Sequence, residues 1–219
     1  MRPRTWIRAG VWLLACLPCG EAVAQQPTSV DKPRAASQAE MTPAVDAAEE
    51  RRQREFGLKA AFLWNAVRYV TWPTTAFVDA STAYTIGIIG RDPFGQALEV
   101  TLKDKKVGDR GFAVQRYAKW SELSAKQRDD LLACHLLWIA EATDAELAAI
   151  VRATTGRAIL LVSDRGAFLA AGGTVAVYIS QNKLGFQVDS EALKRQGLKA
   201  SANLLKLSKA NTDEGEGKR

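Results

Sequence analysis

Few residues in this chain have the chemistry that catalysis needs. The sequence contains one histidine, His135, in the middle of the apolar stretch Cys134–Ile139. A general base at that position would have to face a cleft at the end of a strand, whereas a histidine inside an apolar strand is more often hydrogen-bonded within the fold. We therefore interpret His135 as structural, and a hydrolase that uses it as a base is the alternative.

Ser163 and Asp164 offer a nucleophile beside an acid, but their setting argues against acyl chemistry. No Gly-x-Ser-x-Gly elbow surrounds Ser163, and the side chains of adjacent residues diverge. Gly87 and Gly90 lack the third glycine of a dinucleotide-binding loop. The sequence also has no Gly-Lys-Ser/Thr phosphate loop and no acidic cluster with metal-ligand spacing. We expect a protein that is not an enzyme, without catalytic residues, metal or cofactor.

The N-terminus has the pattern of an export signal. Three arginines precede a short apolar run, and an A-x-A motif ends at Ala24. The run is too short to span a bilayer. We predict a signal peptide over residues 1–24 with cleavage between Ala24 and Gln25. A lipoprotein box ending at Cys16 is the alternative, but the apolar segment in front of it would be very short.

Removal of residues 1–24 changes the charge and the cysteine content. Loss of three arginines and Glu21 leaves 27 basic and 23 acidic residues, a net charge of +4. This charge is spread along the chain, whereas nucleic-acid binding would need clustered Lys and Arg with aromatics between them. Cys134 becomes the only cysteine, so neither an internal disulfide nor a cysteine-based zinc site can form. Its apolar neighbours indicate a small buried hydrophobe rather than a reactive thiol.

Composition divides the rest of the chain into three parts. Residues 25–45 are rich in Gln, Pro, Ser, Thr and Ala, which predicts a flexible leader. Residues 46–210 form a single predicted domain, in which a helix begins near Asp46 and ends before Pro73. Residues 211–219 are a charged tail that we expect to be disordered.

Within the predicted domain, strand patterns alternate with helix patterns and then form a hairpin. Apolar runs bounded by turn residues predict buried strands, and alternation on both sides of Gln181-Asn182 predicts an antiparallel hairpin. The expected strands are Tyr84–Gly90, Phe112–Tyr117, Cys134–Ile139, Ile159–Val162, Thr174–Ile179 and Lys183–Val188. The expected helices between and after them are Phe94–Leu102, Ser124–Asp130, Asp144–Arg152, Ser190–Gln196 and Ser201–Ala210. This order predicts an α/β fold: a mixed, largely parallel sheet with a C-terminal antiparallel hairpin and helices on both faces.

Six blocks of the sequence resemble, in order, those of the YfiR family of periplasmic regulators. They are Leu58–Pro73, with its K-A-A-F-L-x-N pattern and closing W-P, Ile86–Gly95, with its D-P-F-G turn, Cys134–Ala140, Leu160–Asp164 with Gly172-Gly173, Lys183–Phe186, and Leu198–Leu207. The resemblance covers nearly the whole predicted domain. Family members with stabilising disulfides have paired cysteines, and Cys134 has no partner in the exported chain.

The resemblance implies a periplasmic, dimeric, non-catalytic regulator. Such proteins restrain an inner-membrane diguanylate cyclase through its periplasmic sensor portion, which lowers cyclic di-GMP and biofilm output. An outer-membrane lipoprotein relieves the restraint. A small-molecule-binding component of a transport system is the alternative function, although two-lobed receptors of that class are longer than this chain.

Two segments that follow strands are the expected contact sites for a partner or ligand. One is the turn after the first strand, and the other follows the fourth strand. The carboxyl ends of parallel strands are where such sheets bind ligands. The candidate contact residues are Asp92, Phe94, Gly95, Asp164, Arg165, Gly172 and Gly173.

Overall fold

A computed structural model describes residues 43–208. The predicted signal segment, nearly all of the predicted leader and the charged tail lie outside the described residues. The elements are α1 (Pro43–Tyr69), β1 (Val70–Thr71), η1 (Thr74–Ala76), β2 (Tyr84–Ile89), α2 (Ala97–Leu102), β3 (Phe112–Tyr117), η2 (Trp120–Glu122), α3 (Ala125–Leu132), β4 (Leu136–Ile139), α4 (Asp144–Thr154), β5 (Leu160–Ser163), β6 (Val175–Ser180), β7 (Lys183–Val188), α5 (Ser190–Arg195) and β8 (Lys199–Ala200). Residues 202–208 are also helical.

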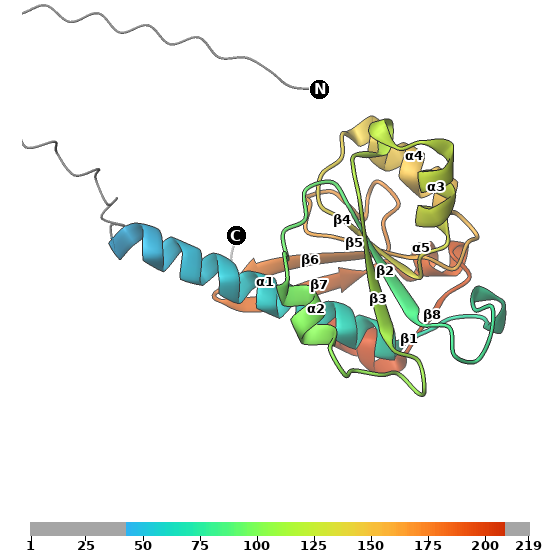
Figure 1. Ribbon diagram of the computed structural model, residues 1–219, viewed down its shortest axis with the longest axis horizontal. Helices are drawn as coiled ribbons and strands as arrows, with labels where there is room; N and C mark the ends of the chain where they lie inside the picture. The colour runs from blue at the N-terminus through green and yellow to red at the C-terminus, as the bar shows by residue number, and fades with distance from the viewer. Residues whose placement is uncertain (1–42, 209–219) are drawn as a thin grey trace, which may run out of the picture. The chain divides into compact units, whose positions relative to one another are not determined.

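The main sheet has six strands in the order β3-β2-β4-β5-β6-β7 (Figure 1). Strands β2 to β6 pair in parallel with their neighbours, and β7 pairs antiparallel with β6. The hairpin turns at Gln181 and Asn182, which both have positive φ, as a two-residue hairpin loop requires. The predicted fold class is therefore confirmed.

Alternate strand residues enter two separate apolar cores, because successive side chains of a strand point to opposite faces. Leu136 and Trp138 of β4 belong to the core under α1 and α2, whereas Leu137 and Ile139 belong to the core on the other face. The second core also contains Leu131 of α3 and residues of α4. Helices thus cover both faces of the sheet (Figure 1).

Helix starts follow local capping where the sequence provides it. Ser124 and Thr143 form reciprocal capping boxes with Gln127 and Glu146, which start α3 and α4. Two starts differ from the sequence prediction by three residues. Helix α1 begins at Pro43 rather than near Asp46, and proline suits a first helical turn because it lacks the N–H that would be unpaired there. Helix α2 begins at Ala97 rather than Phe94, because residues 92–95 form a separate turn.

A small second sheet was not predicted from the sequence. Strands β1 and β8 pair antiparallel over two residues each, and the N–H of Ser201 donates to the carbonyl of Tyr69 at 2.8 Å. Two-residue strands have no readable periodicity. This pairing holds the helix at 202–208 beside the end of α1.

The order of the strands creates a switch point between β2 and β4. The connection after β2 leads to β3 on one side, whereas the connection after β4 leads to β5 on the other side. Open α/β sheets bind ligands in the crevice at such a point. Within residues 43–208, no helix is long and apolar enough to cross a membrane.

Candidate functional site

A hollow of about 720 Å³ lies at the carboxyl edge of β2, β4 and β5, beside α1. Its size is in the range of small-molecule sites. Charged side chains dominate its lining, with a few apolar ones among them. The lining residues are Arg52, Glu55, Phe56 and Lys59 from α1, Arg91, Asp92 and Pro93 after β2, Trp138, Ala140 and Glu141 from β4 and its loop, and Asp164 after β5.

Lys59 is a buried charge that joins α1 to the end of β5. Its residue is 3% exposed, and its ammonium donates to Asp164 Oδ2 at 2.6 Å and to the Glu55 carboxylate. Burial disfavours the charged form, but the hydrogen bonds that Lys59 donates to Asp164 and then to Glu55 outweigh it, so the pKa of Lys59 is raised. The ammonium also lies 5.9 Å from the centre of the Trp138 ring. Lys59 therefore stays charged at any physiological pH.

Trp138 forms the apolar floor of the hollow. It is fully buried, and Phe94 packs edge-on against it with ring centres 5.0 Å apart. Its indole N–H has no hydrogen-bond partner among the described residues. Phe94, a predicted contact residue, is itself 3% exposed and therefore supports this floor instead of offering a free contact surface.

Arg116 of β3 organises the turn after β2. Asp92 accepts from the N–H of Phe94 through Oδ1 and from Arg116 Nε through Oδ2, both at 2.7 Å. The Arg116 guanidinium also donates to the carbonyl of Gly95 and to Glu99. These bonds, with Glu99 the largest influence, raise the pKa of Arg116, and the same contact lowers the pKa of Glu99. The turn is thus fixed by an arginine that sequence reasoning did not single out.

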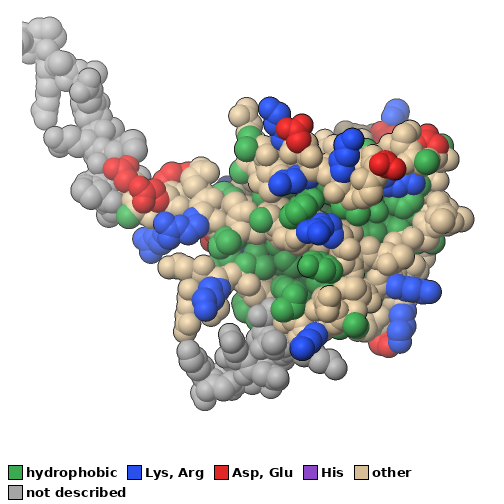
Figure 2. Space-filling view, turned by 90° about the horizontal axis from the view of Figure 1, so that it is seen from below, with side chains coloured by type: hydrophobic (Ala, Val, Ile, Leu, Met, Phe, Trp, Pro, Cys, Tyr) green, Lys and Arg blue, Asp and Glu red, His purple; other side chains and the backbone are tan. Residues whose placement is uncertain are grey.

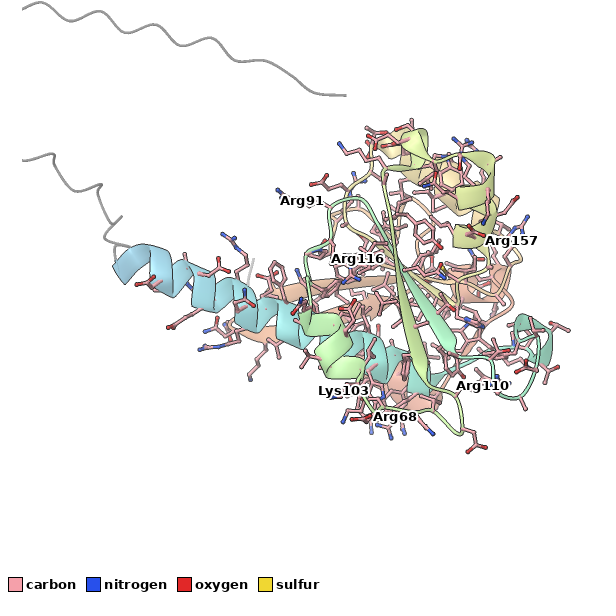
Figure 3. All side chains as sticks on the ribbon, in the orientation of Figure 1. Arg68, Arg91, Lys103, Arg110, Arg116 and Arg157 are labelled. Atoms are coloured by element: carbon pink, nitrogen blue, oxygen red, sulfur yellow. The ribbon has the colours of Figure 1, made fainter. Side chains whose placement is uncertain are left out.

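The loops after β2 and β4 approach each other closely at the mouth of the hollow. Gly90 has φ +88°, and a Cβ there would lie 2.9 Å from the backbone N of Glu141. Arg91 reaches the Glu141 carboxylate at 3.4 Å, and its side chain is 86% exposed. Arg91 extends outward from the body in Figure 3. It is an accessible cation of this rim, as is Arg52 of α1.

The segment after β5 contributes one residue to the hollow and anchors another outside it. Asp164 lines the hollow through its bond with Lys59. Arg165 donates instead to the carbonyl of Ala142 and pairs with Asp144 at 3.2 Å. The hydroxyl of Ser163 donates to the carbonyl of Ile139 at 2.7 Å, so it closes the sheet edge and is not presented as a nucleophile.

Gly172 and Gly173 lie away from the hollow. Gly172 has φ +97° and faces Val151 of α4, and a Cβ on Gly173 would lie 2.3 Å from the ring of Phe168. Phe168 belongs to the core on the α3 and α4 face. The structure therefore places Asp92 and Asp164 in the lining of one hollow, leaves Gly95 exposed on the turn, and separates Gly172 and Gly173 from them.

Several lining residues were missed by sequence reasoning. Glu55 and Lys59 had one available signal, because their i,i+4 spacing on a helix favours an ion pair. Arg91 stands next to a predicted contact residue. Nothing local connects Lys59 with Asp164, which is 105 positions away.

His135 is structural, as the sequence indicated. Its Nδ1 accepts from the N–H of Thr85 at 3.0 Å, so Nε2 carries the proton and donates to the carbonyl of Ala76 at 3.0 Å. The ring stacks on Phe77 with centres 4.6 Å apart. Burial lowers the pKa of His135, and the nearby Arg110 adds to the effect. The neutral ring ties the loop around η1 to β2 and β4.

Cys134 is buried on the opposite face of the sheet, beside Tyr117. The two side chains are 3.6 Å apart, and burial raises the pKa of the Cys134 thiol to about 11. Burial also raises the pKa of Tyr117. The thiol is therefore protonated at neutral pH. Over the described part of the chain, no group of three or more His, Cys, Asp or Glu residues is placed to hold a metal ion.

The fold and the hollow define a doubly wound α/β domain with a charged crevice at its switch point. A family model described as YfiR/HmsC-like matches residues 56–209, which is more than half of the chain. The protein therefore belongs to the YfiR/HmsC-like family. Among proteins with curated functions, none matches the chain.

Proposed function

We propose that this protein is a periplasmic, non-catalytic regulator that represses an inner-membrane diguanylate cyclase by binding the periplasmic sensor portion of the cyclase. The observation that carries the proposal is the family match over residues 56–209, which spans nearly all of the described domain. Repression would keep cyclic di-GMP and biofilm output low. Release by an outer-membrane lipoprotein, a homodimeric state and export by a signal peptide cleaved after Ala24 belong to the same proposal, and nucleic acid is not among the proposed partners.

The internal bonding of the candidate catalytic groups supports a regulator. His135 uses both ring nitrogens inside the fold, the Ser163 hydroxyl bonds a backbone carbonyl, and the thiol of Cys134 is buried and protonated. A regulator of this kind needs higher affinity for the inactive state of the cyclase than for its active state, because only differential binding shifts an equilibrium.

The rim of the hollow is the proposed contact surface. Arg91 is exposed and paired only loosely, so it is available to a partner without loss of a buried bond. Asp164 and Lys59 hold α1 and the loop after β5 in place behind this rim. Truncating a rim charge at an interface changes mainly the association rate and the salt dependence of binding.

The test is recovery of membrane diguanylate cyclases with the tagged, exported protein and with two single charge reversals. Arg91→Glu changes the rim, and Arg157→Glu is the matched control because Arg157 is exposed on a distant part of the molecule (Figure 3). We expect the Arg91→Glu variant to lose cyclase recovery by about tenfold, the scale of a reversed charge contact, and Arg157→Glu to behave as the wild type. Equal recovery with all three proteins would reject the rim as the contact surface.

A small-molecule-binding component of a transport system is the second candidate, favoured by the hollow itself. Its volume of about 720 Å³ suits a small ligand. Ligand binding to the folded state raises the melting temperature. A screen of periplasmic solutes by thermal shift, repeated with Asp164→Asn to alter the lining, separates this function from regulation. A ligand that stabilises only the wild type, together with no effect on cyclic di-GMP, would favour transport.

A further inference from the structure

One face of the domain combines unpaired cations with exposed apolar side chains. It is built by the C-terminal half of α1, by α2 and the loop after it, and by β8 with the helix at 202–208. Figure 2 shows hydrophobic side chains over the middle of this face, with Lys and Arg among them and Asp and Glu toward its margins. We call it the basic face, and its cations are Arg68, Lys103, Lys105, Lys106, Lys199 and Lys206.

Contacts between side chains and between strands join these segments into one surface. The Arg68 guanidinium and the Lys105 ammonium lie 4.7 Å and 5.1 Å from the centre of the same Trp64 ring. Lys199 is paired with Thr71, directly after α1, and thus brings the C-terminal segment alongside. Arg68 and Lys103 lie along the same edge of the molecule in Figure 3.

None of the cations of the basic face has an acidic partner, whereas half of the other Lys and Arg residues at 43–208 form an ion pair. Within residues 43–208, no carboxylate forms an ion pair with any of the six. Elsewhere, ion pairs occupy Arg52, Lys59, Arg91, Arg116, Lys126, Arg165, Lys194 and Arg195. Glu99 of α2 is paired with Arg116, outside the face. Asp104 and Asp109 are the acidic residues of the loop itself, so six cations and these two acids leave a net charge of +4. The face therefore keeps a net positive charge.

Apolar exposure is concentrated on the same face. Val100 is 72% exposed and Leu207 is 52% exposed, and they are two of the three large exposed hydrophobic residues in the described domain. Trp64, which contacts Arg68 and Lys105, is half-buried. Tryptophan is enriched where one side of a ring meets apolar material and the other meets water.

We propose that the basic face docks onto an anionic phospholipid surface. Clustered Lys and Arg are attracted to anionic lipid, and exposed apolar side chains at the same place can enter the headgroup region. Five of the six cations are lysines, a residue depleted from protein–protein interfaces, which favours lipid over an acidic protein. Docking would hold the protein at the membrane whether or not it represses a cyclase, so the inference goes beyond the proposed function.

The test is co-sedimentation of the chain from Gln25 onward with vesicles. Vesicles of phosphatidylcholine containing about 30% phosphatidylglycerol supply the anionic surface, and phosphatidylcholine alone is the neutral control. We expect binding to the anionic vesicles only, with loss of most of it between about 50 mM and about 500 mM salt, because salt screens surface charges.

Two triple variants with equal changes in net charge locate the surface. Lys103→Glu, Lys105→Glu and Lys106→Glu together should weaken vesicle binding at least about tenfold. The control combines Lys119→Glu, Lys126→Glu and Arg157→Glu, which are exposed residues outside the basic face, and should bind within about twofold of the wild type after allowance for net charge. Circular dichroism of both variants establishes that each is folded.

Three outcomes would overturn the proposal. These are absence of binding to anionic vesicles, equal binding to neutral vesicles, and equal loss in the two triple variants. If vesicles are not bound but the basic-face variant loses recovery of a membrane protein, the face contacts an acidic protein partner instead. None of these readouts depends on cyclic di-GMP, so failure of this inference and failure of the proposed function are distinguishable.

Discussion

Lys59 shows how a single buried charge can define a site. Its ammonium has two carboxylate partners, and the pair with Asp164 spans 105 positions of sequence. Removing one partner of a buried charge leaves that charge poorly compensated, which costs more than the hydrogen bond itself. Because Glu55 still accepts a hydrogen bond from Lys59, removal of Asp164 should lower the free energy of unfolding by less than removal of one partner of an isolated buried pair.

The first prediction concerns Asp164→Asn. We expect this change to lower the free energy of unfolding by about 1–2 kcal/mol, measured by urea denaturation. Asp144→Asn is the matched control, since its carboxylate pairs with Arg165 but is 99% exposed, and it should change stability by less than about 0.5 kcal/mol. Equal effects of the two substitutions would contradict a buried, tightly held Lys59.

The second prediction concerns His135 and pH. The pKa of His135 is lowered in the folded state from 6.5, so the unfolded chain binds more protons than the folded one as the pH falls below 6.5. The contribution of neutral His135 to the free energy of unfolding should therefore be fully present above pH 6.5. Below that pH the free energy of unfolding should fall by up to about 1.4 kcal/mol per pH unit.

The measurement is the free energy of unfolding between about pH 7.5 and about pH 5.5, a window in which His is the side chain that ordinarily titrates. His135 is the only histidine of the chain, so His135→Gln should flatten the profile in this window. A variant profile as steep as that of the wild type would show that another group is responsible.

Two glycines show how elements differ in their tolerance of a side chain. Gly57 lies within α1, and a Cβ there would have nothing within 4 Å. Gly173 precedes β6, and a Cβ there would collide with the buried ring of Phe168 at 2.3 Å. The first position needs no glycine, whereas the second needs one for close packing.

The third prediction uses these two positions as a pair. Gly57→Ala should raise the free energy of unfolding by about 0.5–1 kcal/mol, because alanine favours the helix. Gly173→Ala should lower it by about 1–3 kcal/mol, because the overpacked core must shift. Thermal unfolding measures both, and a neutral Gly173→Ala would mean that Phe168 moves freely in its core.

The long elements could be predicted from the sequence because their signals are local. Phe112–Tyr117 and Lys183–Val188 are strands with the predicted bounds, since turn residues flank apolar alternation. The pairing of β1 with β8 could not be predicted, because two residues carry no period. The site was only partly predictable for a related reason. Asp92 and Asp164 stand after recognisable strands, but the strand order that places both in one hollow with Lys59 depends on long-range pairing.

The whole molecule joins two surfaces of different character. The hollow at the switch point has paired charges and a rigid floor, which suits specific contact with one partner. The basic face has unpaired lysines and exposed apolar residues, which suits a broad anionic surface. On the two proposals together, the protein stays at the inner membrane through the basic face and binds the cyclase through the rim of the hollow.

The most direct test of the regulatory account is the intracellular concentration of cyclic di-GMP in a strain that lacks this gene. We expect a clear rise on deletion, full reversal by the wild-type gene and by Arg157→Glu, and incomplete reversal by Arg91→Glu, whose rim charge lies at the hollow. Immunoblotting of each strain establishes equal protein levels. An unchanged concentration in the deletion strain, under conditions in which the wild-type protein is present, would contradict the regulatory account.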